Sequence, residues 1–266
     1  MMRALMLLSG LVCATAFVVN PALSRQQSPR SLSSSAPSAL NAYKKVFVAG
    51  GSKGVGRCVV EKLLAAGKQV VALVRDESVC ADMNKMDGVT AIQGDAFVIK
   101  DVENAMDGCD AAITSLGGST DDQRIDYVGN NHVIESAGIL GVTRVVLVTS
   151  IGCGSSKEAA PPTVFETLKE VLAAKEKAEN VLIKYYTNTN WTIIRPGGLK
   201  SEPATGNAIL TEDATVIGAI HREDVADLVV KALDAGSSER KVLSAIDPSV
   251  TSSVNVEGKN VEEFAL

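Results

Sequence analysis

A short β-branched strand that runs into a glycine cluster constrains this chain more than any other feature. The stretch from Val46 to Arg57 reads VFVAGGSKGVGR, and a helical pattern follows it. Gly50 allows a sharp turn out of the strand, Gly54 lets backbone N–H groups approach a pyrophosphate, and Gly56 lets helix and strand pack closely. The helix N-terminus then faces the phosphates. The pattern predicts the strand–turn–helix of a nucleotide-binding β-α-β unit; the alternative is a tight turn that holds nothing.

Strands and helices alternate along the chain, which predicts an α/β fold: a single Rossmann-type, doubly wound parallel sheet with helices on both faces. The predicted strands are Lys45–Ala49, Gln69–Val74, Thr90–Gln93, Ala111–Thr114, Arg144–Thr149, Thr192–Arg195 and Lys241–Ala245. The predicted helices are Val55–Ala66, Val102–Met106, Asp121–Ala137, Phe165–Tyr186 and Asp224–Ala235. Pro161 and Pro162 are expected to form a flexible loop after the fifth strand.

The first 42 residues have the composition of a targeting segment. An apolar run follows Arg3 and leads to the small residues Ala14-Thr15-Ala16, which suit a signal peptidase. Residues 17–42 are rich in Ser, Ala and Pro, and no acidic residue occurs before Glu61. We therefore expect a signal peptide at 1–16, a transit-like segment at 17–42, an NAD(P)-binding domain at 43–250 and a loosely held tail at 251–266.

This order of segments resembles the bipartite plastid presequences of algae whose plastids lie inside extra membranes. In those presequences a phenylalanine follows the signal cleavage site, as Phe17 does here. The resemblance implies delivery to the stroma of a complex plastid. The alternative is a secreted protein with a disordered linker.

Charge and composition exclude several classes of function. Three of the 26 basic residues and none of the 31 acidic residues lie before residue 43, so the rest of the chain has a net charge of −8. That balance argues against a nucleic-acid partner. No apolar stretch after the signal segment is long enough to span a membrane. The two histidines and the cysteines, which form no Cys-x-x-Cys pair, predict no metal site. Cys153 is expected to be a small buried residue rather than a redox-sensitive thiol.

The end of the second predicted strand indicates which dinucleotide the chain prefers. Arg75 follows this strand, where an arginine accommodates the 2′-phosphate of NADP and an acid binds the free ribose of NAD. Lys53, inside the glycine loop, adds a second cation. The predicted cofactor is therefore NADP, although a strand one residue longer would place Asp76 at the ribose. The loop contacts expected for the cofactor are Gly50, Ser52, Lys53, Gly54, Val55 and Gly56.

Two further loops follow predicted strands at the edge where open α/β sheets bind ligands. Asp95 and Ala96 follow the third strand, and an aspartate there can accept a hydrogen bond from the adenine amino group. Leu116 and Gly117 follow the fourth strand, with small residues beside them that leave room for a ribose. The alternative for each is an ordinary turn at the end of a strand.

Taken together, the motifs resemble the atypical short-chain dehydrogenase/reductases of the NmrA-like and biliverdin reductase B-like kind. The resemblance covers residues 44–248. It rests on the glycine loop, LVRD at 73–76, GD at 94–95, DYVGN at 126–130, VTS at 148–150, TIIRPGGL at 192–199 and REDVA at 222–226. It implies that Pro196 and Gly197 lie near the nicotinamide carboxamide; a turn that ends the sixth strand is the alternative.

The resemblance also implies catalytic residues, with one departure. Typical members end the fifth strand with a serine and carry Tyr-x-x-x-Lys on the next helix; here Ser150 matches the serine and Lys175 the lysine. Val171 stands at the tyrosine position and cannot carry a proton. Ordinary alcohol or ketone chemistry is therefore in doubt, although some similar proteins reduce substrates with a proton from solvent.

Two functions remain. The first is an NADP-dependent oxidoreductase that acts on a small conjugated plastid metabolite, such as a tetrapyrrole, flavin or quinone. The second is a non-catalytic NADP(H)-binding sensor or assembly factor that docks on a plastid protein complex. A nucleotide-sugar epimerase is a poor third, because that chemistry needs the missing tyrosine and a larger C-terminal domain.

Overall fold

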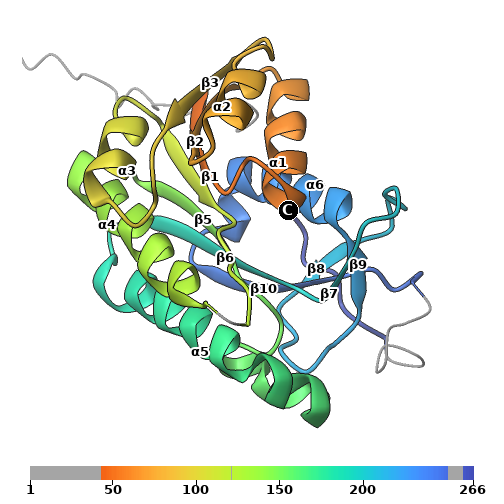
Figure 1. Cartoon of the computed structure of the whole chain (residues 1–266). Coiled ribbons are helices and arrows are strands. Elements are labelled where there is room, and N and C mark those ends of the chain that lie inside the picture. The colour runs from red at the N-terminus through yellow and green to blue at the C-terminus, as the bar shows by residue number, and fades with distance from the viewer. Residues whose placement is uncertain (1–42, 121, 251–259) are drawn as a thin grey trace, which may run out of the picture. The chain divides into compact units, whose positions relative to one another are not determined.

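A computed structural model of the chain describes residues 43–120, 122–250 and 260–266. The predicted signal and transit segments therefore lie outside the described residues. All described residues belong to one compact unit. Within them, strands and helices alternate as the sequence predicts (Figure 1).

The sheet has eight strands in the order β3-β2-β1-β4-β5-β6-β10-β8, and all neighbours pair in parallel except β10 and β8. The strands are β1 (Lys45–Ala49), β2 (Gln69–Val74), β3 (Val89–Gln93), β4 (Ala111–Thr114), β5 (Arg144–Val148), β6 (Asn190–Pro196), β8 (Ile209–Thr211) and β10 (Lys241–Ile246). The strand order reverses between β1 and β4, which is where open α/β sheets bind ligands. The predicted α/β, doubly wound fold is confirmed.

Helices cover both faces of the sheet (Figure 1). They are α1 (Gly54–Ala65), α2 (Glu77–Met83), α3 (Ile99–Met106), α4 (Asn130–Leu140), α5 (Pro162–Tyr185) and α6 (Arg222–Asp234). Side chains alternate along β1, so that Val46 and Val48 pack with α1, α2 and α6, whereas Phe47 and Ala49 pack with α3, α4 and α5. Burial on both faces explains why the central strands are almost wholly apolar.

Several local features differ from the sequence prediction, among them the unpredicted antiparallel edge strand β8. The helix predicted over Asp121–Ala137 is a π-helix (η2, Ile125–Gly129) that continues into α4. The sequence missed α2, which Asp76 caps, and a small two-stranded sheet of β7 (Gly198–Lys200) and β9 (Ala219–His221). Pro162 begins α5 instead of lying in a loop, because proline tolerates the first turn of a helix.

The end of the chain packs against the domain. The Phe264 amide donates to the Leu210 carbonyl. The Phe264 side chain packs against the part of the core that lies between the sheet and helices α1, α2 and α6. Two short 3₁₀ helices, η3 (Gly154–Ala159) and η4 (Gly236–Ser238), complete the described elements. In the described part of the chain, every helix is too short or too polar to cross a membrane.

Candidate functional site

The glycine loop between β1 and α1 forms the centre of the candidate site. Gly50 and Gly54 have φ angles of 85° and 57°, which favour glycine. A β-carbon on Gly56 would lie 2.1 Å from the Gly50 carbonyl oxygen, so this glycine is needed for the helix to start so close to the loop. A β-carbon on Gly54 would meet nothing nearer than the Arg222 Nε at 4.0 Å. The backbone at Gly54 is therefore open, as approach to a pyrophosphate requires.

The segment after β4 packs directly against the glycine loop. The Ser115 amide donates to the Ala49 carbonyl, and β-carbons added at Gly50 and Gly56 would lie 2.9 and 2.6 Å from the Ser115 Oγ. Leu116 and Gly117 directly follow Ser115. The glycine loop and the loop after β4, both predicted to contact the cofactor, therefore lie next to each other. The β3 loop is organised by its own side chains: the Asp95 Oδ1 accepts from the Phe97 amide, and the Ala96 carbonyl contacts His132 Nδ1 at 2.8 Å.

Arg75 and Asp76 have different roles in the structure. Strand β2 ends at Val74, so Arg75 is the first residue beyond it, and its side chain is exposed. Asp76 is the N-cap of α2, because its Oδ1 accepts from the Val79 amide at 3.0 Å. Hydrogen bonds from the Ser78 hydroxyl and the Val79 amide hold the pKa of Asp76 below its usual range. Asp76 therefore does not occupy the strand-end position, which leaves Arg75 there.

The ends of β5 and β6 lie side by side at the same sheet edge. The Ile151 amide donates to the Pro196 carbonyl, which places Ser150 beside the Pro196-Gly197 turn. The Ser150 hydroxyl, half-buried, donates to the Ile151 carbonyl at 3.0 Å. A β-carbon on Gly197 would lie 2.1 Å from the Gly218 carbonyl oxygen, so the chain beyond β6 passes tightly against the segment before β9.

Lys175 reaches the same edge from α5. Its Nζ lies 2.7 Å from the Asp126 Oδ1 and 3.4 Å from the Leu116 carbonyl oxygen. Asp126 is fully buried in the π-helix, and its Oδ2 accepts from the Gly118 amide. The DYVGN motif thus supplies a carboxylate that holds both the lysine and the β4 loop, a role that sequence reasoning missed. Val171 lies one turn before Lys175 on α5 and is half-buried.

A buried ionic network, also missed in the sequence, fixes α5 against the sheet. The Arg195 Nε and Nη2 donate to the two Glu179 carboxylate oxygens at 3.0 and 2.7 Å, and the Thr149 hydroxyl donates to Glu179 as well. Arg195 also donates to Ser155. The network links the carboxyl ends of β5 and β6 to α5. It therefore orients the helix face that carries Lys175. It is charge-assisted and bidentate, which gives a defined geometry.

Cys153 lies beside this network and is fully buried. Burial raises the pKa of its thiol to about 12. The thiolate is the reactive form, so Cys153 is an inert packing residue, as the sequence favours.

Two cavities lie at opposite edges of the sheet. One, of about 430 Å³, is lined by Gly54, Arg57, Cys58, residues 201–203, Arg222 and Glu223, and so adjoins the glycine loop. The other, of about 380 Å³, is lined by residues such as Gly138, Thr143 and Thr189, which precede strands β5 and β6. Of these two cavities, only the first adjoins the edge formed by the C-terminal ends of the parallel strands, where ligands of such sheets bind. Arg222 lines this cavity, although the sequence analysis used it only as part of the REDVA motif.

The sequence pattern of a family described as NAD(P)H-binding matches residues 50–236. The chain belongs to this family. The match begins in the glycine loop and includes Arg75, Ser150 and Lys175.

Several known proteins and solved structures are similar to this chain. A chloroplastic protein of Arabidopsis thaliana, At2g34460, is 33% identical over 216 residues, which are 76% of each chain. YhfK of Bacillus subtilis, described as a sugar epimerase, is 30% identical over 203 residues, covering 74% of this chain and 91% of YhfK. Among solved structures, ChuY of Escherichia coli O157:H7, described as an anaerobilin reductase, is 29% identical with a TM-score of 0.72; the alignment covers 78% of this chain and 99% of ChuY.

Proposed function

We propose that this protein is an NADPH-dependent reductase of a flat, conjugated acceptor. The observation that carries the proposal is the meeting of the open glycine loop, the Ser150–Pro196 corner and Lys175 at one sheet edge, with Val171 where a proton-donating tyrosine would stand. Conjugated acceptors suit such a site because their reduced forms take protons from water.

The residues present fit a bound dinucleotide. The uncovered backbone at Gly54 and the amino end of α1 can bind a pyrophosphate, and no acidic side chain lies in the first turn of α1 to repel it. Arg75 and Lys53, both exposed, supply cations for a 2′-phosphate. NADPH, when bound, supplies the hydride. Its preference over NADH is part of the proposal.

The chain's own residues would position the reactants. Lys175, held by Asp126, keeps an ammonium beside the β4 loop, where it can donate to a ribose hydroxyl. The Ser150 hydroxyl can turn from the Ile151 carbonyl to a substrate oxygen. The Glu179–Arg195 network would hold α5 against the end of β6. With NADPH bound as the hydride donor, the acceptor would take its proton from solvent, because Val171 cannot supply one.

An acceptor panel tests the reductase. The purified full-length chain is mixed with NADPH and FMN, menadione, biliverdin or a simple ketone, and cofactor oxidation is followed by absorbance. We expect faster oxidation with one or more conjugated acceptors than with the ketone. General acid–base groups contribute about 10²–10⁴-fold in rate, and this site lacks the family's tyrosine. Tight NADPH binding without reduction of any acceptor would contradict the proposal.

The buried Asp126–Lys175 pair and Val171 also suit a second function, an NADP(H)-binding sensor or assembly factor of a plastid complex. In that case NADPH changes which plastid proteins bind the chain, and no acceptor is reduced. An epimerase remains disfavoured despite the name of YhfK, because Val171 cannot move a proton.

We further propose that the protein works in the stroma of a complex plastid. The support is the Phe17-containing presequence pattern and a relative described as chloroplastic. A reporter fused to residues 1–42 should enter the plastid of an alga of this kind, and Phe17→Ala should stop it outside the inner membranes. Secretion of the reporter, or equal import of the Phe17→Ala fusion, would contradict this localisation.

A further inference from the structure

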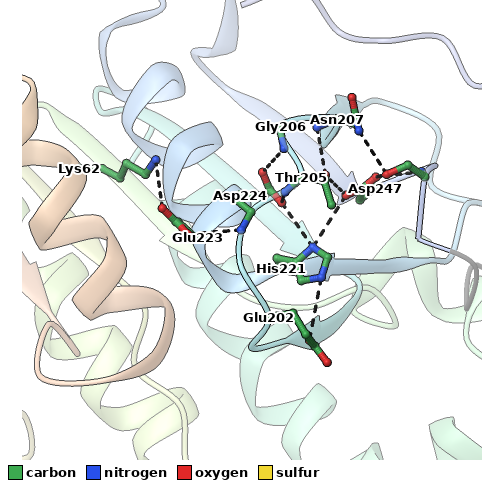
Figure 2. A network of polar contacts seen from close by, with 11 residues as sticks. Lys62, Glu202, Thr205, Gly206, Asn207, His221, Glu223, Asp224 and Asp247 are labelled. Carbon is green, nitrogen blue, oxygen red and sulfur yellow. Dashed lines mark hydrogen bonds and ion pairs between the residues drawn. The ribbon is translucent and has the colours of Figure 1, made fainter.

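His221 lies in a buried polar cluster outside the candidate dinucleotide contacts. It ends β9, directly before α6, and 9% of its side chain is exposed. Its Nδ1 is buried and has no hydrogen-bond partner among the described residues. The nitrogen faces the Asp224 Oδ2 at 3.5 Å and the Asp247 Oδ2 at 3.9 Å, whereas Glu202 lies on the Nε2 side (Figure 2). Both Nδ1 distances exceed those of good hydrogen bonds.

The two carboxylates are held in fixed positions. Asp224 accepts from the Thr205 and Gly206 amides, each at 3.0 Å. Asp247 accepts from the Ser249 amide and hydroxyl, and from the Thr205 hydroxyl. The two amide donors leave further lone pairs on Asp224. Hydrogen bonds of this kind commonly orient metal-ligating carboxylates.

The charge balance of the cluster favours a cation. Asp224 and Asp247 are 4% and 0% exposed. One oxygen of each carboxylate and a ring nitrogen of His221 all lie within 4.8 Å of one another. Within the described part of the chain, Asp224 has no ion pair with a lysine or arginine. The nearby cations act elsewhere: Lys62 pairs with Glu223, and the Arg222 Nη1 donates to Ser201. A buried carboxylate without such compensation, as Asp224 is, is costly.

We propose that His221 Nδ1, Asp224 Oδ2 and Asp247 Oδ2 bind a divalent cation that accepts mixed nitrogen and oxygen ligands, such as Mn²⁺ or Zn²⁺. Tetrahedral bonds of about 2.0–2.2 Å separate neighbouring ligand atoms by roughly 3.3–3.6 Å, so the cluster needs only a small contraction. Water completes the coordination. The sequence predicts no metal site, because the ligands lie in two segments that only the fold brings together.

The cation would act as a structural clip. It would join the start of α6 to the end of β10, and through Thr205 it would hold the loop between β7 and β8. Residues 201–203 of that loop line the cavity beside Gly54. The site would therefore stabilise one wall of that cavity without taking part in hydride transfer.

Metal analysis of the purified full-length chain tests the proposal. The metal-stripped protein is dialysed against Mn²⁺ or Zn²⁺, and bound metal and melting temperature are measured. We expect about one equivalent per chain and a higher melting temperature with metal. His221→Gln, which removes no hydrogen bond to the loop, should weaken binding by about tenfold or more. Asp247→Asn is the second variant. It keeps an oxygen acceptor for the loop and should also weaken metal binding.

His132→Gln is the matched control, because His132 is distant in sequence and contacts the Ala96 carbonyl. It should bind metal as the wild type does. Mn²⁺ avoids competition from thiols, since it prefers oxygen and nitrogen ligands. The proposal is overturned if the folded wild type retains no metal, or if His221→Gln retains as much as His132→Gln.

Discussion

The Nζ of Lys175 lies 2.7 Å from the Oδ1 of Asp126, a carboxylate with no exposed surface. The pair joins α5 to the π-helix, and the other Asp126 oxygen holds the Gly118 amide. The lysine that the family resemblance assigns to the ribose is therefore positioned by a buried acid. An ammonium has three donors, and the Leu116 carbonyl accepts one of them, so donor capacity remains for a ligand.

Asp126→Asn should lower both stability and NADPH affinity. The substitution removes the charge that compensates Lys175 and disturbs the acceptor of the Gly118 amide, which should cost roughly 1–3 kcal/mol in the free energy of unfolding. Asp122→Asn is the control, because Asp122 pairs with the exposed Arg124 and should change stability by less than about 0.5 kcal/mol. Urea unfolding and cofactor titration measure the two effects. Equal behaviour of both variants would argue against a positioning role for Asp126.

Arg75→Ala should weaken NADPH binding and leave NADH binding unchanged. Charge-assisted hydrogen bonds to a phosphate contribute roughly 1.5–3 kcal/mol, so the dissociation constant for NADPH should rise about tenfold or more. Titration calorimetry with both cofactors measures this, and Arg124→Ala, another exposed arginine, is the control. A wild type that binds the two cofactors equally would rule out the preference for NADP.

Asp76 should act on stability and not on the choice of cofactor. Asp76→Ala removes the cap of α2 and should lower the melting temperature, whereas Asp76→Asn keeps a good cap and should change it little. The pKa of Asp76 is lowered in the folded protein, so its contribution is present above the unfolded pKa of about 3.9 and is lost as the pH falls through the folded pKa. Thermal melts between pH 2 and 7 would show this. If Asp76→Asn instead altered the ratio of NADH to NADPH affinity, the acid would be reading the ribose.

The sequence predicted the sheet well because its strands are buried on both faces. Continuous apolar runs such as Val145–Val148 can only be central strands once glycine turns and helices flank them. The short strands β7, β8 and β9 carry no such signal, since each has three residues. The cap at Asp76, followed by a serine two positions on, was a visible signal for α2 that the prediction did not use.

The candidate site was predictable only where chemistry follows a local motif. Gly50, Gly54, Gly56 and Arg75 are readable because a strand, a turn and a helix occur in immediate succession. The partners of Lys175 and Arg195 are not, because Asp126 and Glu179 reach them through the packing of separate elements. Their burial, which makes these pairs energetically important, depends on the tertiary fold and leaves no spacing pattern.

Val171→Tyr should create carbonyl reductase activity if the reductase proposal is right. Val171 and Lys175 are four residues apart on α5 and so share a helix face, which is the spacing at which a lysine assists a tyrosine. A phenol there could protonate a ketone oxygen held by Ser150, and general acids contribute about 10²–10⁴-fold in rate. NADPH oxidation with a simple ketone, measured for the full-length wild type and variant, checks the gain. Val171→Phe, equally bulky but without a proton, is the matched control. If the tyrosine and phenylalanine variants are equally inactive while both bind NADPH, Val171 does not face the reacting centre, and the missing acid cannot explain the choice of acceptor.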